Sequence, residues 1–387
     1  MKSKVAIVGS GHTKFGRLQD NLEQLIVAVS KEALQEANIG GHDVDAVFLG
    51  HFNAGMVADA FASSLVLQAD EGLRFKPATR YENACASGAA AVYAAIDAIP
   101  SGRIEVALVV GVEKMTNNDT AGVTRALAGA GYQNNPDEAG VSFPAVFAQA
   151  AQIYGQRYGD PMLAMAKIAA KNHTNAMKNP YAQLHKELDV AFCNTVSDKN
   201  PLIAPSLRMS DCSLISDGAA AVVLVAEHRA AEFAKRAQFA AAVHVSDLLP
   251  LSSRDWASFV GPEKAIQAAY QQAGIAVGNV NFAEVHDCFT IAELLIYEAM
   301  GLTEKGRGVE ALDSGMVYRD GALPVNLSGG LKAKGHPVGA TGVSMHVLAY
   351  RQLTGQAGEM QLPHAKLGLV FNMGGAAVAN YASILSV

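Results

Sequence analysis

Cysteine is scarce in this chain, with only four residues among 387. These are Cys85, Cys193, Cys212 and Cys288, and no two of them have the CxxC spacing that is typical of a zinc site. So few cysteines in so long a chain cannot build the disulfide framework of a small secreted domain. We therefore expect free thiols, and any important one among them should be reactive rather than structural.

Charged residues and long apolar runs are also scarce. Charged residues make up 17% of the chain, 30 basic and 36 acidic side chains give a net charge of −6, and no stretch concentrates Lys and Arg as a nucleic-acid surface requires. The apolar run Val5-Ala6-Ile7-Val8 is too short for a signal peptide or a membrane span. The last residues, 384–387, lack a Ser-Lys-Leu-like peroxisomal address. We expect a cytoplasmic protein with no nucleic-acid partner and no membrane span.

Hydrophobic residues, in contrast, make up 50% of the chain, and there are 36 glycines. Short β-branched runs alternate with amphipathic stretches, which is the pattern of strands buried under helices in an α/β protein. The length predicts two or three structural units with a large core.

The sequence also contains a weak internal repeat. Residues 31–53 can be laid over residues 267–289, and each segment reads as a helix, a short turn and a strand. Gly218-Ala219-Ala220 similarly matches Gly375-Ala376-Ala377 as a late strand of each copy, and Ser87-Gly88 and Thr341-Gly342 each precede a helix. Chance matches are possible in an alanine-rich chain, but together these pairs favour two copies of one α/β unit.

The first copy carries an insertion of about a hundred residues. We predict an amino-terminal half formed by residues 1–116 plus 217–235, an inserted domain at 117–216 and a carboxy-terminal half at 236–387, with a five-stranded sheet in each half. The insertion has helical patterns near residues 145–158 and 162–177. An insertion too long for a loop usually serves as a lid or a substrate-binding subdomain.

Cys85 is the first candidate for chemistry. It lies where a strand ending near Tyr81 turns into a helix that should end at Pro100. Unpaired N–H groups and the helix dipole favour an anion at a helix start, so we expect a lowered thiol pKa and a site for an oxyanion. The alternative is a small residue chosen for packing.

His336 is the second candidate, in a segment with five nearby glycines and just before another helix. If a pseudo-twofold axis relates the two halves, the two helix starts face each other and His336 can act as the base for Cys85. The alternative is an exposed loop histidine, but so many glycines indicate close backbone approach.

A third cluster, His286-Asp287-Cys288-Phe289, follows a predicted strand at 282–285. The carboxyl ends of strands are where α/β proteins bind ligands. A metal is not expected, because adjacent His, Asp and Cys side chains do not converge easily on one ion. Cys193 and Cys212 have no catalytic partner in the sequence and are interpreted as packing residues.

Together these motifs resemble the thiolase family, in order and over the whole chain. The resemblance is closest to the sterol-carrier-protein-X type, which carries His-Asp-Cys-Phe where most thiolases carry Asn-Glu-Ala-Phe. The segments concerned are residues 83–91, 111–115, 208–213 with 217–221, 286–289 and 335–337. The resemblance implies the α/β thiolase fold: duplicated βαβαβαββ halves in a five-layered α/β/α/β/α core with an inserted loop domain, assembled as a homodimer or tetramer.

The resemblance also implies roles. Cys85 would be the acylated nucleophile, His336 its activator and His286 a group that holds a thioester oxygen or water. Backbone N–H groups of Cys85 and Gly374 would form an oxyanion hole. Further expected substrate-binding residues are Asn326, Gly330, Phe289 and Met115.

One motif departs from ordinary thiolases. Their Cys-x-Gly motif, whose cysteine removes the α-proton, is replaced here by Asn372-Met373-Gly374. In the sterol-carrier-protein-X type the cysteine of His-Asp-Cys-Phe is thought to take over, and Cys288 fits that role.

The implied activity is acyl transfer between coenzyme A thioesters through a Cys85 acyl-enzyme, with acyl-CoA and coenzyme A as substrates and no separate cofactor. Thiolysis of a 3-oxoacyl-CoA and condensation with acetyl-CoA are both open. Two alternatives remain: a condensing enzyme with a non-thioester acceptor, and an acyl-CoA-binding scaffold without turnover.

Overall fold

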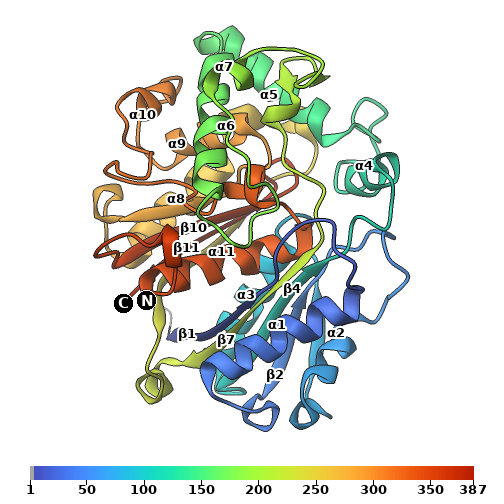
Figure 1. Ribbon diagram of the computed structural model, residues 1–387, viewed down its shortest axis with the longest axis vertical. Helices are drawn as coiled ribbons and strands as arrows, with labels where there is room; N and C mark the ends of the chain where they lie inside the picture. The colour runs from blue at the N-terminus through green and yellow to red at the C-terminus, as the bar shows by residue number, and fades with distance from the viewer. Residues whose placement is uncertain (1–3) are drawn as a thin grey trace.

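The computed structural model describes residues 4–387 (Figure 1). Nine strands form one mixed sheet in the order β3-β2-β4-β7-β1-β8-β11-β10-β9. Their bounds are β1 (Val5–His12), β2 (Ala46–Gly50), β3 (Ala78–Tyr81), β4 (Val106–Glu113), β7 (Gly218–Ala226), β8 (Ala237–Ser246), β9 (Phe282–Val285), β10 (Leu367–Gly374) and β11 (Ala379–Ser386).

The two ends of this sheet repeat one topology. In the first half β2 lies parallel to β4, β4 is antiparallel to β7 and β7 is antiparallel to β1. In the second half β9, β10, β11 and β8 are joined in the same order and the same directions. The fold is therefore the α/β thiolase arrangement that the resemblance implies, with the second half following the pattern of the first.

The prediction of a five-stranded sheet in each half is wrong for the second half. The first half has β3 as a fifth strand, but its counterpart is a single parallel bridge between Ala283 and Val325. Asn326 has a φ of +57°, so the chain turns away after one paired residue. The two halves are also not separate sheets, because β1 and β8 pair at Ala6↔Gln238 and Ile7↔Ala237.

Helices cover both outer faces and fill the space between the halves. On the outside, α1 (Leu22–Ala37) packs on β1, β4 and β7, and α8 (Val260–Ala273) packs on β8 and β11. In the middle, α3 (Ser87–Ala98) and α11 (Val338–Leu353) contact each other, and α11 also contacts β4 and β10. Figure 1 shows α11 crossing between the two halves.

The strands are buried on both sides, which explains their continuous apolar runs. All eight residues of β4 are buried. Leu108 and Val110 pack in the cluster that contains α1, whereas Val109 packs in the cluster that contains α3. This alternation follows from the two-residue period of a strand.

Glycine allows the two central helices to meet at their starts. A Cβ on Gly88 would lie 2.7 Å from the carbonyl oxygen of Gly339, and a Cβ on Gly342 would lie 2.2 Å from the amide nitrogen of Ala89. Both contacts are too close for any larger residue. This close approach brings the turn before α3 next to the turn before α11.

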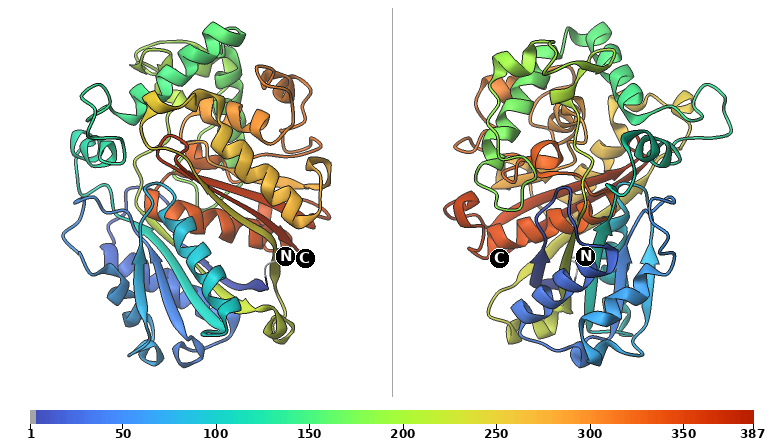
Figure 2. Two further views of the ribbon diagram at one scale, coloured as in Figure 1. Left: turned by 180° about the vertical axis from the view of Figure 1, so that it is seen from behind. Right: turned by 45° about the vertical axis from the view of Figure 1, so that its right-hand side comes forward.

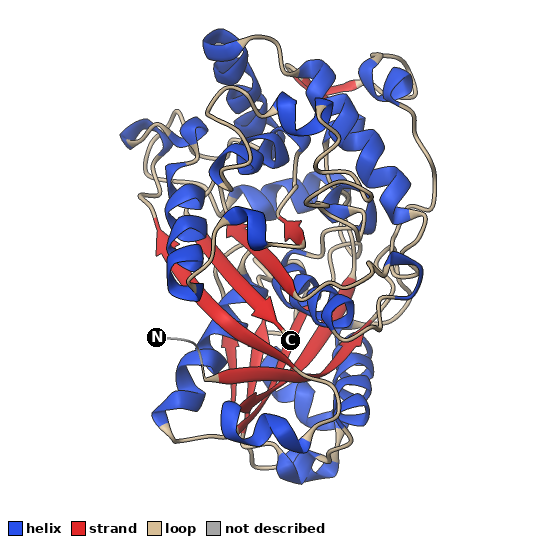
Figure 3. Ribbon diagram, turned by 90° about the vertical axis from the view of Figure 1, so that its left-hand side faces the viewer, coloured by secondary structure: helices blue, strands red, loops and turns tan. Residues whose placement is uncertain are grey.

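The insertion lies above the second half (Figure 2). It contains α4 (Thr120–Ala128), α5 (Phe143–Tyr158), α6 (Met162–Ala176), α7 (Val190–Asn194) and a small hairpin of β5 (Leu202–Ala204) and β6 (Leu207–Arg208). Helix α6 packs on α9 (Thr290–Ala299) of the second half. The remaining short helices are α2 (Ala62–Leu65) and α10 (Val309–Asp313). In Figure 3 the helices of this region lie beyond one end of the strands.

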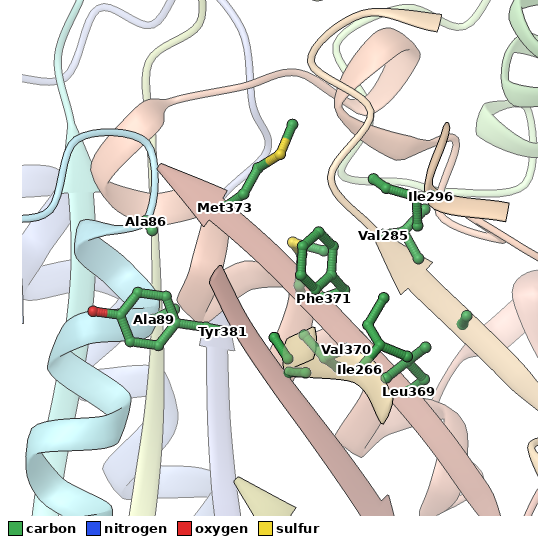
Figure 4. Close-up of a cluster of buried hydrophobic side chains, with 14 of the residues drawn as sticks. Ala86, Ala89, Ile266, Val285, Ile296, Leu369, Val370, Phe371, Met373 and Tyr381 are labelled. Carbon is green, nitrogen blue, oxygen red and sulfur yellow. The ribbon is translucent and has the colours of Figure 1, made fainter. Parts of the chain in front are cut away.

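Side chains of β10 and β11 alternate between the two faces of the sheet, and those on one face form the core between the halves. In Figure 4 Phe371 lies on the side of Val285, whereas Tyr381 approaches Ala89 of α3. Tyr381 also accepts a hydrogen bond from Asn83 Nδ2, at 2.8 Å, through its hydroxyl oxygen. The segment before α3 is thus held against the second half.

One stretch within residues 4–387, Ala84–Ser101, is long and apolar enough to cross a membrane by length and composition alone. It contains α3, and 56% of it is buried inside the protein. Its apolar character is that of a core helix.

Candidate active site

Cys85 lies in a tight turn between β3 and α3. Ala84 has a φ of +50°, in the left-handed region that a residue with a Cβ seldom adopts. Ser87 locks the turn, because its hydroxyl accepts a hydrogen bond from Asn83 N–H at 2.9 Å and donates to Ala84 O at 2.6 Å. Such strain is typical of functional sites and presents the Cys85 side chain at the edge of a cavity.

This cavity has a volume of about 290 Å³ and receives residues from both halves and from the insertion. Cys85, His286, Cys288 and His336 all line it. The predicted nucleophile, its predicted base and the two predicted residues of the third cluster therefore converge on one space. This convergence follows from the contact between the starts of α3 and α11 and from the parallel pairing of β9 with β10.

The protonation of Cys85 differs from the expectation. The pKa of its thiol is raised to about 12, mainly by burial; the Gly375 amide opposes this rise and the buried Glu113 carboxylate contributes to it. Cys85 precedes the helix N-cap, Ala86, and the amides of Ala86 and Ser87 are engaged within the turn. The helix start therefore does not produce a resting thiolate, and the thiol needs a base when it reacts.

The amides that approach the Cys85 sulfur are those of Cys85 itself and Gly375. The expected oxyanion partner was Gly374, the last residue of β10. Gly375 follows in the turn to β11 with a φ of +61° and lines the cavity. Residues 375–378 thus form a turn and not the late strand that the repeat predicted.

His336 has the geometry of a general base. Its Nδ1 lies 2.7 Å from Thr341 Oγ1, and the Thr341 hydroxyl donates its only proton to Pro337 O at 3.0 Å. Nδ1 must then carry the ring proton, which leaves a lone pair on Nε2. Nε2 is buried and has no hydrogen-bond partner among residues 4–387. Burial and the charge of Lys334 lower the His336 pKa to about 3, so the ring is neutral and can accept a proton.

His286 lies beside His336, with ring centroids 5.1 Å apart and planes at 87°. Its Nδ1 lies 2.8 Å from Asn372 Nδ2. Burial lowers the His286 pKa well below its ordinary value, and the neighbouring His336 and Lys334 lower it further. A neutral His286 is therefore expected throughout the physiological pH range.

Cys288 is 7% exposed and lines the same cavity. Burial raises the pKa of the Cys288 thiol well above its ordinary value, and a negative charge on Cys85 would raise it further. The two sulfurs are thus close enough to influence each other's ionisation. A protonated Cys288 is the resting form.

Cys212, which the sequence interpretation treated as a packing residue, also lines this cavity. Its thiol donates to Arg208 O at 3.5 Å, and its backbone forms a bridge with Phe289. Cys193, in contrast, is fully buried in a small cluster with α6 residues. Cys212 lies in the thiolase-like segment 208–213 and Cys193 lies in no such segment, but the motif does not predict that Cys212 reaches the cavity.

Asp287 does not line the cavity but anchors the loop that carries its two neighbours. Its carboxylate accepts hydrogen bonds from Leu331 N–H at 2.6 Å, Lys332 N–H at 3.2 Å and Asn172 Nδ2 at 2.8 Å. The loop after β9 is thereby tied to the π-helix Gly330–Lys334 that leads to His336.

Asn326 and Gly330, both expected to bind substrate, belong to this support and do not line the cavity of about 290 Å³. Asn326 accepts a hydrogen bond from Val285 N–H at 2.8 Å and donates to Glu293 at 2.9 Å. A Cβ on Gly330 would lie 2.2 Å from Asp287 Oδ2. Asn326 and Gly330 thus support the loops that carry the catalytic residues from outside the cavity.

Phe289 and Met115 do line the cavity, as expected for substrate-binding residues. The remaining wall is mostly apolar and comes largely from α4, α5 and the segments around the β5–β6 hairpin. Phe147 of α5 stacks on Phe289 with centroids 4.7 Å apart and meets Trp256 edge-on at 5.6 Å. The other apolar lining residues are Val123, Leu127, Phe143, Pro144, Ile203, Met209, Leu214, Ile215 and Val338.

No group of three or more His, Cys, Asp or Glu side chains in residues 4–387 is arranged to hold a metal ion. The chemistry that the described side chains offer is a half-buried thiol beside a neutral imidazole with a free lone pair, a second thiol that is buried, and a second imidazole. That combination suits covalent transfer of an acyl group.

Comparisons with known proteins identify the family of the chain. Residues 5–228 match the thiolase N-terminal domain and residues 243–387 the thiolase C-terminal domain-like family. The acetyl-CoA acetyltransferase of Methanothermobacter thermautotrophicus is 37% identical over 374 residues, 96% of each chain. Sterol carrier protein 2 of Oryctolagus cuniculus is 30% identical over 403 residues, 97% of this chain and 71% of the relative.

The fold has matches among solved structures as well. Human mitochondrial 3-ketoacyl-CoA thiolase in complex with CoA superposes with a TM-score of 0.75 at 16% identity, over 100% of this chain and 99% of the other. The chain therefore belongs to the thiolase family, and its activity is thiolase-type acyl transfer.

Proposed function

We propose that Cys85 carries the acyl group and that His336, His286 and Cys288 serve the two half-reactions. In the first, His336 Nε2 takes the Cys85 proton as the sulfur attacks the thioester carbonyl of an acyl-CoA. The amides of Cys85 and Gly375, which approach the Cys85 sulfur, would hold the oxyanion that forms beside it. The C–S bond to coenzyme A breaks, Cys288 gives its proton to the leaving thiolate, and free coenzyme A departs.

The acyl-enzyme then holds a protonated His336 and an ionised Cys288. Acetyl-CoA enters, Cys288 takes a proton from its α-carbon, and N–H groups of His336 and His286 hold the enolate oxygen. The enolate carbon attacks the acyl carbonyl, the bond to Cys85 breaks, and His336 returns its proton to the Cys85 thiolate. Protons balance over the cycle, and thiolysis of a 3-oxoacyl-CoA is the same sequence reversed.

The observation that carries this proposal is the convergence of two thiols and two neutral imidazoles from both halves on one cavity. The high pKa of Cys85 and the low pKa of His336 keep the resting pair uncharged. Proton transfer therefore accompanies attack on the thioester, which protects the thiol from side reactions in the absence of substrate.

The apolar wall formed by α4 and α5 favours a hydrocarbon acyl group over a charged one, because the described lining offers it no charged partner beyond the catalytic groups. We propose that the acyl chain lies against Phe147 and Leu127.

A homodimer is part of the proposal. β3 is an edge strand of the sheet, its Thr79 and Arg80 are exposed, and it ends four residues before Cys85. Pairing of two such edges would cover both strands, as edge strands generally require. Light scattering at micromolar concentration should give twice the chain mass, and a monomer would contradict this arrangement.

The test of the activity is a turnover assay with acetoacetyl-CoA and free coenzyme A, monitored through loss of the 3-oxoacyl thioester and formation of acetyl-CoA. Product analysis with a series of acceptors, thioester and non-thioester, accompanies it. Turnover with coenzyme A supports the proposal. Transfer of the acyl group only to a non-thioester acceptor would show that the second half-reaction is a different one.

A further inference from the structure

Asn372 stands at the centre of the site, where the Cys-x-Gly cysteine of ordinary thiolases is missing. The register of the sheet explains its position. Val285 of β9 pairs with Phe371 of β10 in parallel, so the next residues, His286 and Asn372, emerge side by side at the ends of these strands. Asn372 is fully buried.

One nitrogen of the Asn372 side chain contacts both His286 and the backbone of Cys85. Its Nδ2 lies 2.8 Å from His286 Nδ1 and 3.4 Å from the carbonyl oxygen of Cys85. A carbonyl oxygen can only accept a hydrogen bond, so the amide nitrogen must face this side. The reverse orientation would place the Asn372 Oδ1 atom against another oxygen.

This orientation has a cost in stability that argues for a function. Asn372 Oδ1 is buried, and no side chain or backbone group in the described part of the chain donates a hydrogen bond to it. It lies against α11, where a Cβ on Gly342 would come within 2.7 Å of it. A buried acceptor without a partner is destabilising, and an apolar side chain of similar size would avoid this cost. The bonds made by Nδ2 are therefore the reason to expect asparagine here.

We propose that Asn372 is a positioning residue that fixes the tautomer of His286. Because Asn372 Nδ2 donates to Nδ1, that atom keeps its lone pair and the ring proton of neutral His286 resides on Nε2. His286 thereby becomes a permanent hydrogen-bond donor to the thioester or enolate oxygen. His336, whose Nδ1 is the donor to Thr341, has the opposite tautomer and acts as the base.

The inference rests on the proposed function for the role of the donated bond, but the tautomer itself is a property of the resting enzyme. The two imidazoles lie side by side, with ring centroids 5.1 Å apart. Their opposite tautomers, set by Asn372 on one side and Thr341 on the other, give each ring one task.

The first test is a long-range proton–nitrogen correlation spectrum of the full-length enzyme labelled with ¹⁵N-histidine. The His286 signals among the 11 histidines are identified by their loss in the His286→Gln variant. We expect a protonated Nε2 and an unprotonated Nδ1. A protonated Nδ1 on neutral His286 would overturn the proposal, whatever the enzyme's activity.

The second test is the pH profile of the Asn372→Asp variant. At low pH the introduced carboxyl group and His286 together hold one more proton than at high pH, and His286 keeps its Nε2–H. When the pair loses that proton, the carboxylate holds Nδ1–H, and Nε2 becomes a bare lone pair. The rate of acyl transfer should therefore fall with rising pH by roughly 10²–10³-fold, the usual effect of losing one oxyanion donor. His336 and Lys334 face His286 and lower its pKa, which favours this loss.

The matched control is Asn380→Asp on β11. Asn380 is also fully buried with an unpartnered Oδ1, but its Nδ2 bonds only to backbone carbonyls. This variant should keep the wild-type pH profile. An Asn372→Asp enzyme that is folded and also keeps that profile would contradict the proposal. If the variant does not fold, the wild-type spectrum alone decides.

Discussion

Replacing Cys288 with alanine separates the two half-reactions. In the proposed cycle Cys288 removes the α-proton, a step that cannot proceed without a base. In acylation it only protonates the departing coenzyme A thiolate, which is stable enough to leave as an anion and take its proton from water. The Cys288→Ala enzyme should still form an acyl-enzyme. Condensation and thiolysis should slow by roughly 10²–10⁴-fold, or about 2.7–5.4 kcal/mol of activation free energy, as expected when a positioned base is lost.

The structural cost of the same substitution is small. Cys288 is 7% exposed and borders a cavity of about 290 Å³, so the removed sulfur enlarges an existing space. The loss in unfolding free energy should be about 1 kcal/mol, the value of one buried methylene-sized group. A thermal melt should therefore show a folded protein with a slightly lower midpoint.

The assay is a single-turnover experiment in which acylation by acyl-CoA and transfer to the second thioester are followed separately. Cys212→Ala is the matched control, because it removes a thiol that lines the same cavity but bonds to Arg208 O. This control should leave both steps near the wild-type rates. Equal slowing of both steps in Cys288→Ala would indicate a distorted pocket, and unchanged transfer would refute the role of Cys288 as the base.

Other substitutions and conditions test the remaining parts of the geometry. Cys85→Ser should reduce acyl-enzyme formation strongly with little change in stability, because a hydroxyl lacks the nucleophilicity of the thiolate; unchanged labelling by acyl-CoA would identify another nucleophile. Thr341→Val removes the acceptor of His336 Nδ1–H and should cost about 1–3 kcal/mol in the acylation step, which stopped-flow kinetics can measure and a wild-type rate would contradict. Since the low His336 pKa of about 3 keeps the base neutral, the acylation rate should show no inflection near the ordinary histidine pKa of 6.5, and an inflection there would place the base elsewhere. Phe147→Ala removes the ring stacked on Phe289 and should shift the ratio of kcat/KM values toward longer acyl chains, measured with a chain-length series; an unchanged ratio would place the acyl chain away from α5.

Much of the fold could be predicted because helix and strand signals coincide with the repeat. The overlay of residues 31–53 on 267–289 places Ala37 opposite Ala273, and these are the last residues of α1 and α8. The predicted strand at 282–285 has those bounds in the structure. Local periodicity was enough to predict these helix and strand bounds, because no tertiary contact opposed the local preference.

Other features depend on tertiary contacts that a single sequence does not show. The missing fifth strand of the second half is due to the left-handed turn at Asn326, and the joined sheets depend on a short contact between β1 and β8. The pKa of Cys85 was predicted from the helix start alone, whereas burial dominates it and Glu113 adds to the shift. The proposed domain boundaries stay predictions.

The motifs predict the candidate site but not the role of every residue in them. Cys212 lies in the thiolase-like segment 208–213 and Thr341 in a repeat match, yet their places at the cavity and at His336 emerge only when distant segments meet. Asn372 was noticed only as an absence of cysteine. The contacts of its Nδ2 with His286 and with the Cys85 carbonyl explain why an amide stands at this position.

The central claim is that Cys85 carries the acyl group, and mass spectrometry of the enzyme after mixing with acetyl-CoA tests it most directly. The account predicts one added acetyl group per chain, mapped by digestion to the peptide that contains Cys85 and removed again by free coenzyme A. An acetyl group on Cys288 or Cys212 in its place, or no covalent label in an enzyme that still turns over, would contradict it.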